Sequence, residues 1–381
     1  MEKVETTLKK AIEILGGSST SKRKFLAKFG AVAAGFSMPT IAAAQDTSLE
    51  AGSLEFYNWD TYIGDRTLAN FRRLSNRRVE LSLFATNEEL LNRIRSQRYQ
   101  YDVIMPSNEY LQVMIDEGLL QPLNHGLIPN RRNIATEFQN PNYDNGLRYS
   151  TPYTFLMLGI GYRKSKMKNG IPPTSWKSVF DDTTYSGRIA LLNENLDIFR
   201  LANKYLGQSI NQFTTQSIAA VRALLIRQAP HVKLFHSDDG QDLLVRGEVD
   251  IAVEYNGDIA QAAYENEDVG FAYPSEGSIL ITDSMCIPRN AKRPILAHYF
   301  INFILDGQVG KEISSTILYP TPNLEARRLS EASYRDNPTI FPSKEAIDSC
   351  EFSVLPEQSL KNQIEVAYQE VLLAHQRKSS N

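Results

Sequence analysis

A regular alternation of strand and helix patterns between residues 53 and 118 constrains this chain most. The strand-forming runs SLEFYNW, VELSLFA and YDVIMPS are separated by stretches with helical spacing of apolar residues, such as Leu68, Phe71 and Leu74. Asn87 stands where it would cap the second helix. Strands that are linked through helices become parallel neighbours with right-handed crossovers. The sequence therefore predicts an α/β fold with a parallel sheet.

A second series of strand and helix patterns follows a loop-rich stretch between residues 122 and 146. We expect strands at 151–163, 188–193, 231–235, 248–255, 269–274 and 277–288, and helices at 197–206, 215–228, 257–265, 295–305 and 361–375. The chain has 381 residues, of which 42% are hydrophobic, and this length suits two such units. Two α/β lobes with a ligand cleft between them are expected, with the ligand at loops that follow strands.

The N-terminal segment has the pattern of a cleavable export signal. Ser21-Lys22-Arg23-Lys24-Phe25-Leu26 precedes a short apolar run that ends in Ala42-Ala43-Ala44. The run is too short and its side chains too small for a membrane span. We interpret residues 1–44 as a twin-arginine-like signal peptide, cleaved near Ala44, that directs the protein to the periplasm. Because Lys22 replaces the first Arg of that signal, both the twin-arginine and the general export routes stay open.

Charge and motif content argue against several classes of function. The first 44 residues carry seven Lys or Arg and three Asp or Glu, so the remainder has a net charge of −7, compared with −3 for the whole chain. An acidic exported protein is not expected to bind nucleic acid. The five histidines lack metal-binding spacing, and no nucleophile or cofactor motif is present. The sequence predicts a binding protein with no metal, no cofactor and no enzymatic activity.

The chain contains two cysteines, Cys286 and Cys350. An oxidising compartment permits a disulfide bond between them. Two cysteines allow a single pairing but do not establish it. One disulfide and two buried thiols are both compatible with the sequence.

Aromatic and acidic residues follow the strand patterns of both series. Alkylammonium ligands need such a combination, because an ammonium group donates three hydrogen bonds to charged acceptors and is attracted by aromatic faces. Each of these residues also has a structural interpretation, as a core side chain, a helix cap or a solvated acid. The residues at the strand ends are Trp59 and Tyr62, Ser107 and Glu109, Glu194 and Asp197, Tyr255 and Asp258, and Asp283.

Several segments resemble the spermidine/putrescine-binding proteins of bacterial ABC importers. They are FYNWDTY, YDVIMPS, HSDDGQDLLVRGEVDIAVEYNGD, DSMCIP and YPTPN, and they occur in order from about Leu54 to the C-terminal helix. The resemblance implies a two-lobed type II periplasmic-binding-protein fold, with each lobe a sheet flanked by helices and the polyamine in the cleft. We expect residues 53–151 and 284–330 in lobe 1, and residues 152–283 and 331–376 in lobe 2.

The resemblance implies that aromatic residues contact the ligand's hydrocarbon chain. Trp59 and Tyr62 resemble an aromatic wall and a hydroxyl donor near one end of the polyamine. Tyr255 takes the place of a Trp that stacks on the chain. Tyr319, in the YPTPN segment, matches a tyrosine that contacts the ligand.

The resemblance also implies that polar residues bind the amines. Asp283 matches the central amine-binding aspartate, and Glu194 and Asp197 match a carboxylate pair that holds a terminal amine. Asp258 matches an acid of putrescine-type relatives, and Ser107 resembles a serine that follows the third strand.

The sequence departs from the family pattern at three positions. Glu109 stands where spermidine-type relatives have Tyr, Ile281 replaces an aromatic of the cleft wall, and Ser353 falls near a family Gln. With Glu109 included, the expected carboxylates exceed what a diamine requires. The sequence therefore favours spermidine or a longer polyamine over putrescine.

The expected function is capture of a polyamine by a monomeric protein, which delivers it to the membrane permease of an ABC importer. One alternative is a binding protein for another cationic amine metabolite. A second alternative is a receptor that signals its liganded state to a sensor protein. A third alternative, an exported enzyme on a similar fold, would need a nucleophile–base pair that the sequence does not display.

Overall fold

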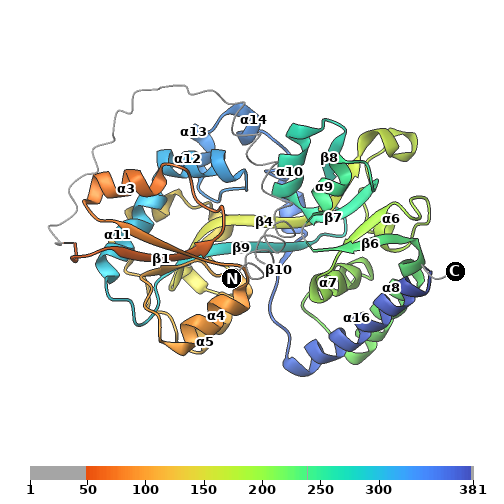
Figure 1. Ribbon diagram of the computed structural model, residues 1–381, viewed down its shortest axis with the longest axis horizontal. Coiled ribbons are helices and arrows are strands. Elements are labelled where there is room, and N and C mark those ends of the chain that lie inside the picture. The colour runs from red at the N-terminus through yellow and green to blue at the C-terminus, as the bar shows by residue number, and fades with distance from the viewer. Residues whose placement is uncertain (1–48, 238, 379–381) are drawn as a thin grey trace, which may run out of the picture. The chain divides into compact units, whose positions relative to one another are not determined.

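The computed structural model describes residues 49–237 and 239–378. The predicted signal peptide, residues 1–44, and its cleavage point near Ala44 lie outside the described residues. Within the described ranges, no helix combines the length and the apolar character needed to span a membrane. Figure 1 shows helices above and below a central set of strands.

Ten strands of the described residues form one sheet with the order β2-β1-β3-β9-β4-β7-β5-β6, to which β10 adds by pairing with β9 and β8 by pairing with β4. Their bounds are β1 (Leu54–Trp59), β2 (Val79–Phe84), β3 (Val103–Ile104), β4 (Ser150–Arg163), β5 (Ile189–Leu192), β6 (Val232–His236), β7 (Ile251–Tyr255), β8 (Val269–Ala272), β9 (Ile279–Cys286) and β10 (Glu351–Phe352). The parallel pairing of β1 with β2 and β3 confirms the prediction for the first series.

The helices lie mostly where the apolar spacing predicts them. Their bounds are α3 (Thr67–Ser75), α4 (Asn87–Ser96), α5 (Asn108–Asp116), α6 (Lys177–Phe180), α7 (Asn195–Tyr205), α8 (Thr215–Gln228), α9 (Gly240–Val245), α10 (Asn256–Glu265), α11 (Pro294–Ile304), α12 (Gly307–Ile317), α13 (Leu324–Leu329), α14 (Ala332–Arg335), α15 (Lys344–Asp348) and α16 (Gln358–Lys378). The helices α12, α13, α14 and α15 were not predicted.

Short 3₁₀ helices replace longer elements in the connecting stretches. They are η1 (His125–Leu127), η2 (Pro129–Asn133), η3 (Thr136–Phe138), η4 (Asn145–Leu147), η5 (Lys164–Lys166), η6 (Lys168–Gly170) and η7 (Ala229–His231). Four of them precede β4, in the stretch where prolines and an Asn-Gly pair predict loops.

Two long antiparallel strands, β4 and β9, join two parts of the sheet (Figure 1). We call β1, β2 and β3 the first sheet segment, and β5, β6, β7 and β8 the second sheet segment. β4 pairs with β9 from Ser150 to Met157, and from Leu158 to Arg163 it pairs with β7 and β8 of the second segment. β9 reaches the first segment through the pairing of Cys286 with Ile104 of β3. The two segments therefore share these two strands.

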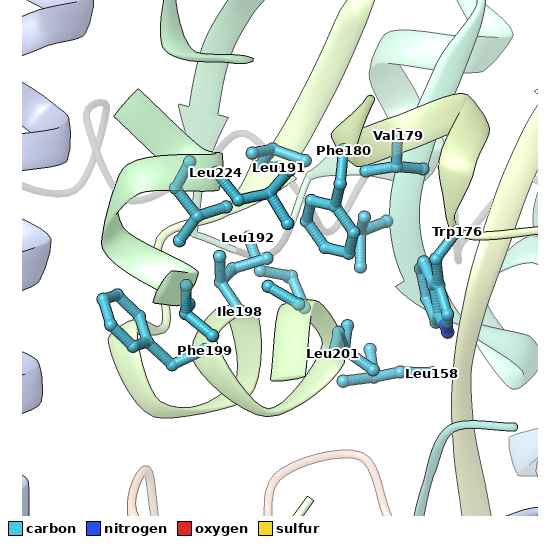
Figure 2. Packing of buried hydrophobic residues seen from close by; sticks show 14 of the residues in the cluster. Leu158, Trp176, Val179, Phe180, Leu191, Leu192, Ile198, Phe199, Leu201 and Leu224 are labelled. Carbon is cyan, nitrogen blue, oxygen red and sulfur yellow. The ribbon is translucent and has the colours of Figure 1, made fainter. Parts of the chain in front are cut away.

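Each sheet segment has its own hydrophobic core. In the second segment, side chains from α6, β5, α7 and α8 pack together, and Trp176, which is fully buried, lies at one edge of the group in Figure 2. The Trp176 indole N–H donates to the carbonyl of Gly277 at 2.8 Å, which satisfies the one polar group of this side chain. The core of the first segment packs α4 and α5 on β1, β2 and β3; its members include Tyr57, Phe84, Leu90, Ile94, Ile104, Leu111 and Met114.

The N-cap of α4 differs from the one expected from the sequence. The N-cap is Thr86, whose hydroxyl accepts from the backbone N–H of Glu89 at 3.1 Å, and the expectation that Asn87 caps this helix is wrong. The side chain of Asn87 instead holds Ser107: its Oδ1 accepts from the Ser107 N–H at 3.1 Å, and its amide donates to Ser107 Oγ at 3.0 Å. Because Thr86 caps the helix, the side chain of Asn87 is available to position the loop that contains Ser107.

Cys286 and Cys350 are both free thiols. Their separation follows from the sheet, because β10 begins directly after Cys350 and pairs with Ile279, at the opposite end of β9 from Cys286. Seven strand residues span about 23 Å, whereas a disulfide requires Cα atoms within about 7 Å. The alternative of two thiols is the one that the fold adopts.

The second core generates a prediction about stability. Leu201 on α7 is fully buried, whereas Leu373 on α16 is 52% exposed. Leu201→Ala leaves a cavity and should lower the free energy of unfolding by about 2–5 kcal/mol. Leu373→Ala, the same change on an exposed helix face, should stay within about 0.5 kcal/mol of the parent. Urea titration measures both values, and equal effects would contradict this placement of the core.

Candidate functional site

Asp283 is a buried carboxylate in the middle of β9. The expectation that it follows the end of a strand is wrong, because β9 continues to Cys286. Its neighbours are Thr154 of β4 and Ser107, with which it forms an isolated antiparallel bridge. The Asp283 side chain lies where the two sheet segments meet, and only 5% of the residue is exposed.

Neutral hydroxyl groups supply the hydrogen bonds to Asp283. Ser107 Oγ donates to Oδ1 at 2.6 Å, and the Tyr62 hydroxyl donates to Oδ2 at 2.7 Å. Tyr62 also shares a hydrogen bond with the hydroxyl of Thr154. Within residues 49–237 and 239–378, no Lys, Arg or His forms an ion pair with Asp283. The cost of burying this charge is therefore offset only by neutral donors.

Burial dominates the titration of this group. It raises the pKa of Asp283 above its usual value, and the hydrogen bonds from Ser107 and Tyr62 oppose the rise only in part. Burial, followed by the nearby Asp283 charge, also raises the pKa of Tyr62 well above its usual value, so this hydroxyl stays protonated and can donate. The arrangement would accept a positive charge readily.

Tyr62, whose hydroxyl donates to Asp283, packs against the ring of a second tyrosine, Tyr319. The rings of Tyr62 and Tyr319 meet edge to face with centroids 5.7 Å apart. The Tyr319 hydroxyl donates to Oδ1 of Asp258, in the first turn of α10, at 2.8 Å. Gly257 permits this approach, because a Cβ at that position would lie 2.5 Å from the Tyr319 ring. Tyr319 thus connects Tyr62, which follows β1, with an acid that follows β7.

A second group of residues centres on Arg200 of α7, which the sequence analysis did not select. Its Nη1 lies 2.6 Å from Oε1 of Glu109, at the start of α5, and 3.0 Å from Oδ1 of Asp197. Its Nη2 donates to the carbonyl of Val354 at 2.7 Å. Only 1% of the Arg200 side chain is exposed. Burial raises the pKa of Asp197, Arg200 lowers it, and the Glu109 charge raises it further.

Asn108 ties the two groups together. This residue is fully buried. Its Oδ1 accepts from the backbone N–H of Thr282 at 3.0 Å, and its amide donates to the carbonyl of Ser353 at 2.7 Å. Because Thr282 precedes Asp283 and Asn108 precedes Glu109, these bonds fix one carboxylate relative to the other. In the sequence, an Asn between a strand pattern and a helix pattern is the signal that points to such a residue.

Glu194 lies at the edge of this arrangement. It is the exposed N-cap residue of α7, and its side chain makes no capping hydrogen bond. The pKa values of Tyr110 on α5 and of Tyr368 on α16 are raised, mainly because these tyrosines are buried. The negative charge of Glu194 contributes to both increases. The Tyr110 hydroxyl donates to Glu88, another acid that the sequence analysis did not select.

Trp59 and Tyr255 line the two cores beside these groups. The Trp59 indole N–H donates to the carbonyl of Met105 at 3.0 Å, and its ring lies 4.4 Å from that of Phe84. Tyr255 ends β7 and packs, together with Ile281, against the second core. Both aromatic residues are half-buried. The structure therefore joins Tyr62, Ser107, Asp283, Tyr319 and Asp258, gathers Glu109 and Asp197 around Arg200, and leaves Trp59, Glu194 and Tyr255 with other described neighbours.

Comparison with known proteins gives concordant matches. The model of the bacterial extracellular solute-binding protein family matches residues 69–342. A putrescine/cadaverine-binding protein of Pseudomonas aeruginosa is 31% identical over 310 residues, which cover 79% of this chain and 87% of that protein. A spermidine/putrescine-binding periplasmic protein of Escherichia coli strain K12 is 31% identical over 327 residues, which cover 85% of this chain and 90% of that protein.

A solved structure gives the same result for the fold. The substrate-binding protein of a spermidine/putrescine ABC transporter from Streptococcus pneumoniae has a TM-score of 0.80 and is 26% identical, and the match covers 85% of this chain and 100% of that chain. The expected α/β, two-lobed binding-protein fold is confirmed.

Burial of Asp283 generates a prediction about pH. A carboxyl group whose folded-state pKa is raised favours folding when it is protonated, and this contribution is lost as the pH rises from its usual value of 3.8 through the folded-state pKa. Asp283→Asn should therefore raise the melting temperature of the ligand-free protein at pH 7, by about 2 °C or more. The difference between variant and parent should shrink towards pH 4.

Asp268→Asn is the matched control, because the pKa of Asp268 is lowered: burial raises it, but hydrogen bonds from Ser165 and Arg163 outweigh that rise. Such a group stabilises the fold above its usual pKa, so this variant should melt lower at pH 7. Thermal melts at both pH values measure these differences. An Asp283→Asn protein that melts below the parent at pH 7 would contradict the description of this carboxylate.

Proposed function

This chain belongs to the bacterial extracellular solute-binding protein family, and we propose that it captures a polyamine and delivers it to an ABC importer. The names of its relatives support a cationic ligand, because they specify putrescine with cadaverine or with spermidine. The family consists of binding proteins. The proposed activity is accordingly capture and release, without a chemical step.

The observation that carries the proposal is the environment of Asp283. A buried carboxylate that only neutral hydroxyl groups contact retains a large part of its desolvation cost. An ammonium group supplies a full positive charge and three donors, and so offsets that cost. The ring of Tyr62, whose hydroxyl donates to this carboxylate, and the neighbouring ring of Tyr319 would attract the cation and pack on its methylene groups.

We assign the remaining site residues from their contacts, where the structure gives one, and otherwise from the family resemblance. Asp258 lies within hydrogen-bonding distance of Tyr319 and would accept from a further amine. Trp59, Tyr255 and the exposed Glu194 would contact the polyamine as the resemblance to the family implies. Ser107 contributes indirectly, because its hydroxyl orients Asp283.

The proposed mechanism is closure of two lobes over the ligand. Residues 53–151 and 284–330 would form one lobe, and residues 152–283 and 331–376 the other. The two strands that the sheet segments share, β4 and β9, are suited to act as the hinge. Closure excludes water from the carboxylates and so strengthens their contacts with the amines. The closed, monomeric form would then dock on the permease.

The proposal includes export. Residues 1–44 would act as the signal peptide, and cleavage near Ala44 would release the binding protein into the periplasm. The relatives whose names include that compartment support this location.

Thermal shift and calorimetry test the proposed ligand. Putrescine, cadaverine, spermidine and spermine are added separately, and at least one of them should raise the melting temperature, because a ligand at 100 times its Kd stabilises by about 2.7 kcal/mol. Asp283→Ala should weaken binding at least tenfold, since a charge-assisted hydrogen bond contributes about 1.5–3 kcal/mol. Asp268→Ala, which removes an acid paired with Arg163, should leave the affinity unchanged.

Two outcomes would contradict the proposal. No shift with any polyamine, together with a shift on addition of another cationic amine such as lysine or agmatine, would identify a different ligand. Unchanged polyamine affinity in Asp283→Ala would remove this residue from the site.

A further inference from the structure

Arg200 forms ion pairs with two of the carboxylates that the sequence assigns to the site. Glu109 and Asp197, both selected from the sequence as ligand-binding acids, each approach the same guanidinium nitrogen of Arg200, at 2.6 and 3.0 Å. A ligand ammonium at that place would make the same two contacts. The protein itself therefore supplies a cation where the sequence pattern suggests a place for one from the ligand.

Several contacts hold Arg200 in this position. Asp197 lies one helical turn before it on α7, and the carbonyl of Val354 accepts from Nη2 at 2.7 Å. Asn108 binds the carbonyl of Ser353, the residue before Val354, and so fixes that acceptor. The side chain is 1% exposed, and a guanidinium does not lose its proton in proteins. A buried charge of this kind is stable only while its partners remain, so an incoming amine would displace it at a high cost.

The contrast with Asp283 determines which part of the site a ligand can use. Among the residues that the structure describes, Asp283 has hydroxyl partners only, whereas Glu109 and Asp197 are already neutralised in part by Arg200. An amine that approached the second group would also meet the positive guanidinium. The carboxylates therefore do not form one continuous row that is open to a long polycation.

Resting on the proposed function, we infer that Arg200 determines specificity: it replaces one ammonium of a longer polyamine, so the site accepts a diamine and disfavours triamines and tetramines. A diamine preference is the opposite of what the number of carboxylates in the sequence suggests. That count favours spermidine because it includes Glu109 and Asp197 as free acceptors. With Arg200 between them, the two acids contribute to excluding a third ammonium.

Calorimetry on three proteins tests the inference. The parent should bind putrescine or cadaverine at least tenfold more tightly than spermidine. Arg200→Gln removes the charge and shortens the side chain, and should shift the ratio of the diamine to the spermidine affinity at least tenfold in favour of spermidine. Lys204→Gln is the matched control, because Lys204 lies on the same helix and pairs with Glu351, outside the proposed site. This control should leave the ratio unchanged.

The ratio of the diamine affinity to the spermidine affinity distinguishes a role of Arg200 in specificity from its other possible roles. An Arg200→Gln protein whose affinities for all polyamines change by the same factor would overturn it, because a purely structural residue or a general competitor has that effect. If Arg200→Gln does not fold, the parent protein alone decides: comparable affinities for putrescine and spermidine overturn the inference, and a tenfold preference for a diamine supports it.

A parent that binds spermidine well leaves the proposed function intact, whereas a parent that binds no polyamine contradicts the proposed function and the inference together.

Discussion

The site depends on one buried carboxylate that is held by neutral hydroxyl groups. Asp283 lies within β9, a strand that both sheet segments share, so its position is fixed by strand pairing and not by a loop. The hydroxyl groups that orient it come from Tyr62, after β1, and from Ser107, before α5. A buried carboxylate with neutral donors keeps part of its desolvation cost, and a bound cation would offset that cost.

The buried acids of the site have two kinds of partner, a cationic side chain or neutral hydroxyl groups. Around Glu109 and Asp197 the protein provides a cation of its own, and the resulting ion pairs connect α5 with α7. Around Asp283 it provides dipoles only. Asn108 connects the two groups by its hydrogen bonds with Thr282 and Ser353. This partition of charge would give a binding protein a preference for ligand length as well as for ligand charge.

Much of the fold could be predicted from hydrophobic spacing. The helix at 215–228 and the parallel pairing of the first strands agree with the structure, because these elements have strong periodicity. The helix α12 was missed because its two glycines and several hydroxyl residues lower helix propensity. Packing compensates: Gly310 lies directly against Ala326 of α13, where a Cβ would come within 2.8 Å. Such tertiary contacts leave no local signal.

The sequence identified most residues of the candidate site but not how they are arranged. Strand ends located most of its residues, but Asp283 was assigned to a strand end although the strand expected at 277–288 continues beyond it, as β9 does. Arg200 was missed because an Arg on an amphipathic helix is typical of a solvated face. Only the folded chain brings Glu109, more than ninety positions earlier, against that guanidinium.

The most direct test of the central claim is an NMR titration of the Asp283 carboxyl carbon with and without putrescine. The pKa should lie above its usual value in the ligand-free protein, because burial disfavours the charge. Bound putrescine should lower that pKa, because a neighbouring ammonium stabilises the carboxylate. A pKa that stays the same when putrescine binds would contradict the claim that this buried acid is where the ligand's positive charge is bound.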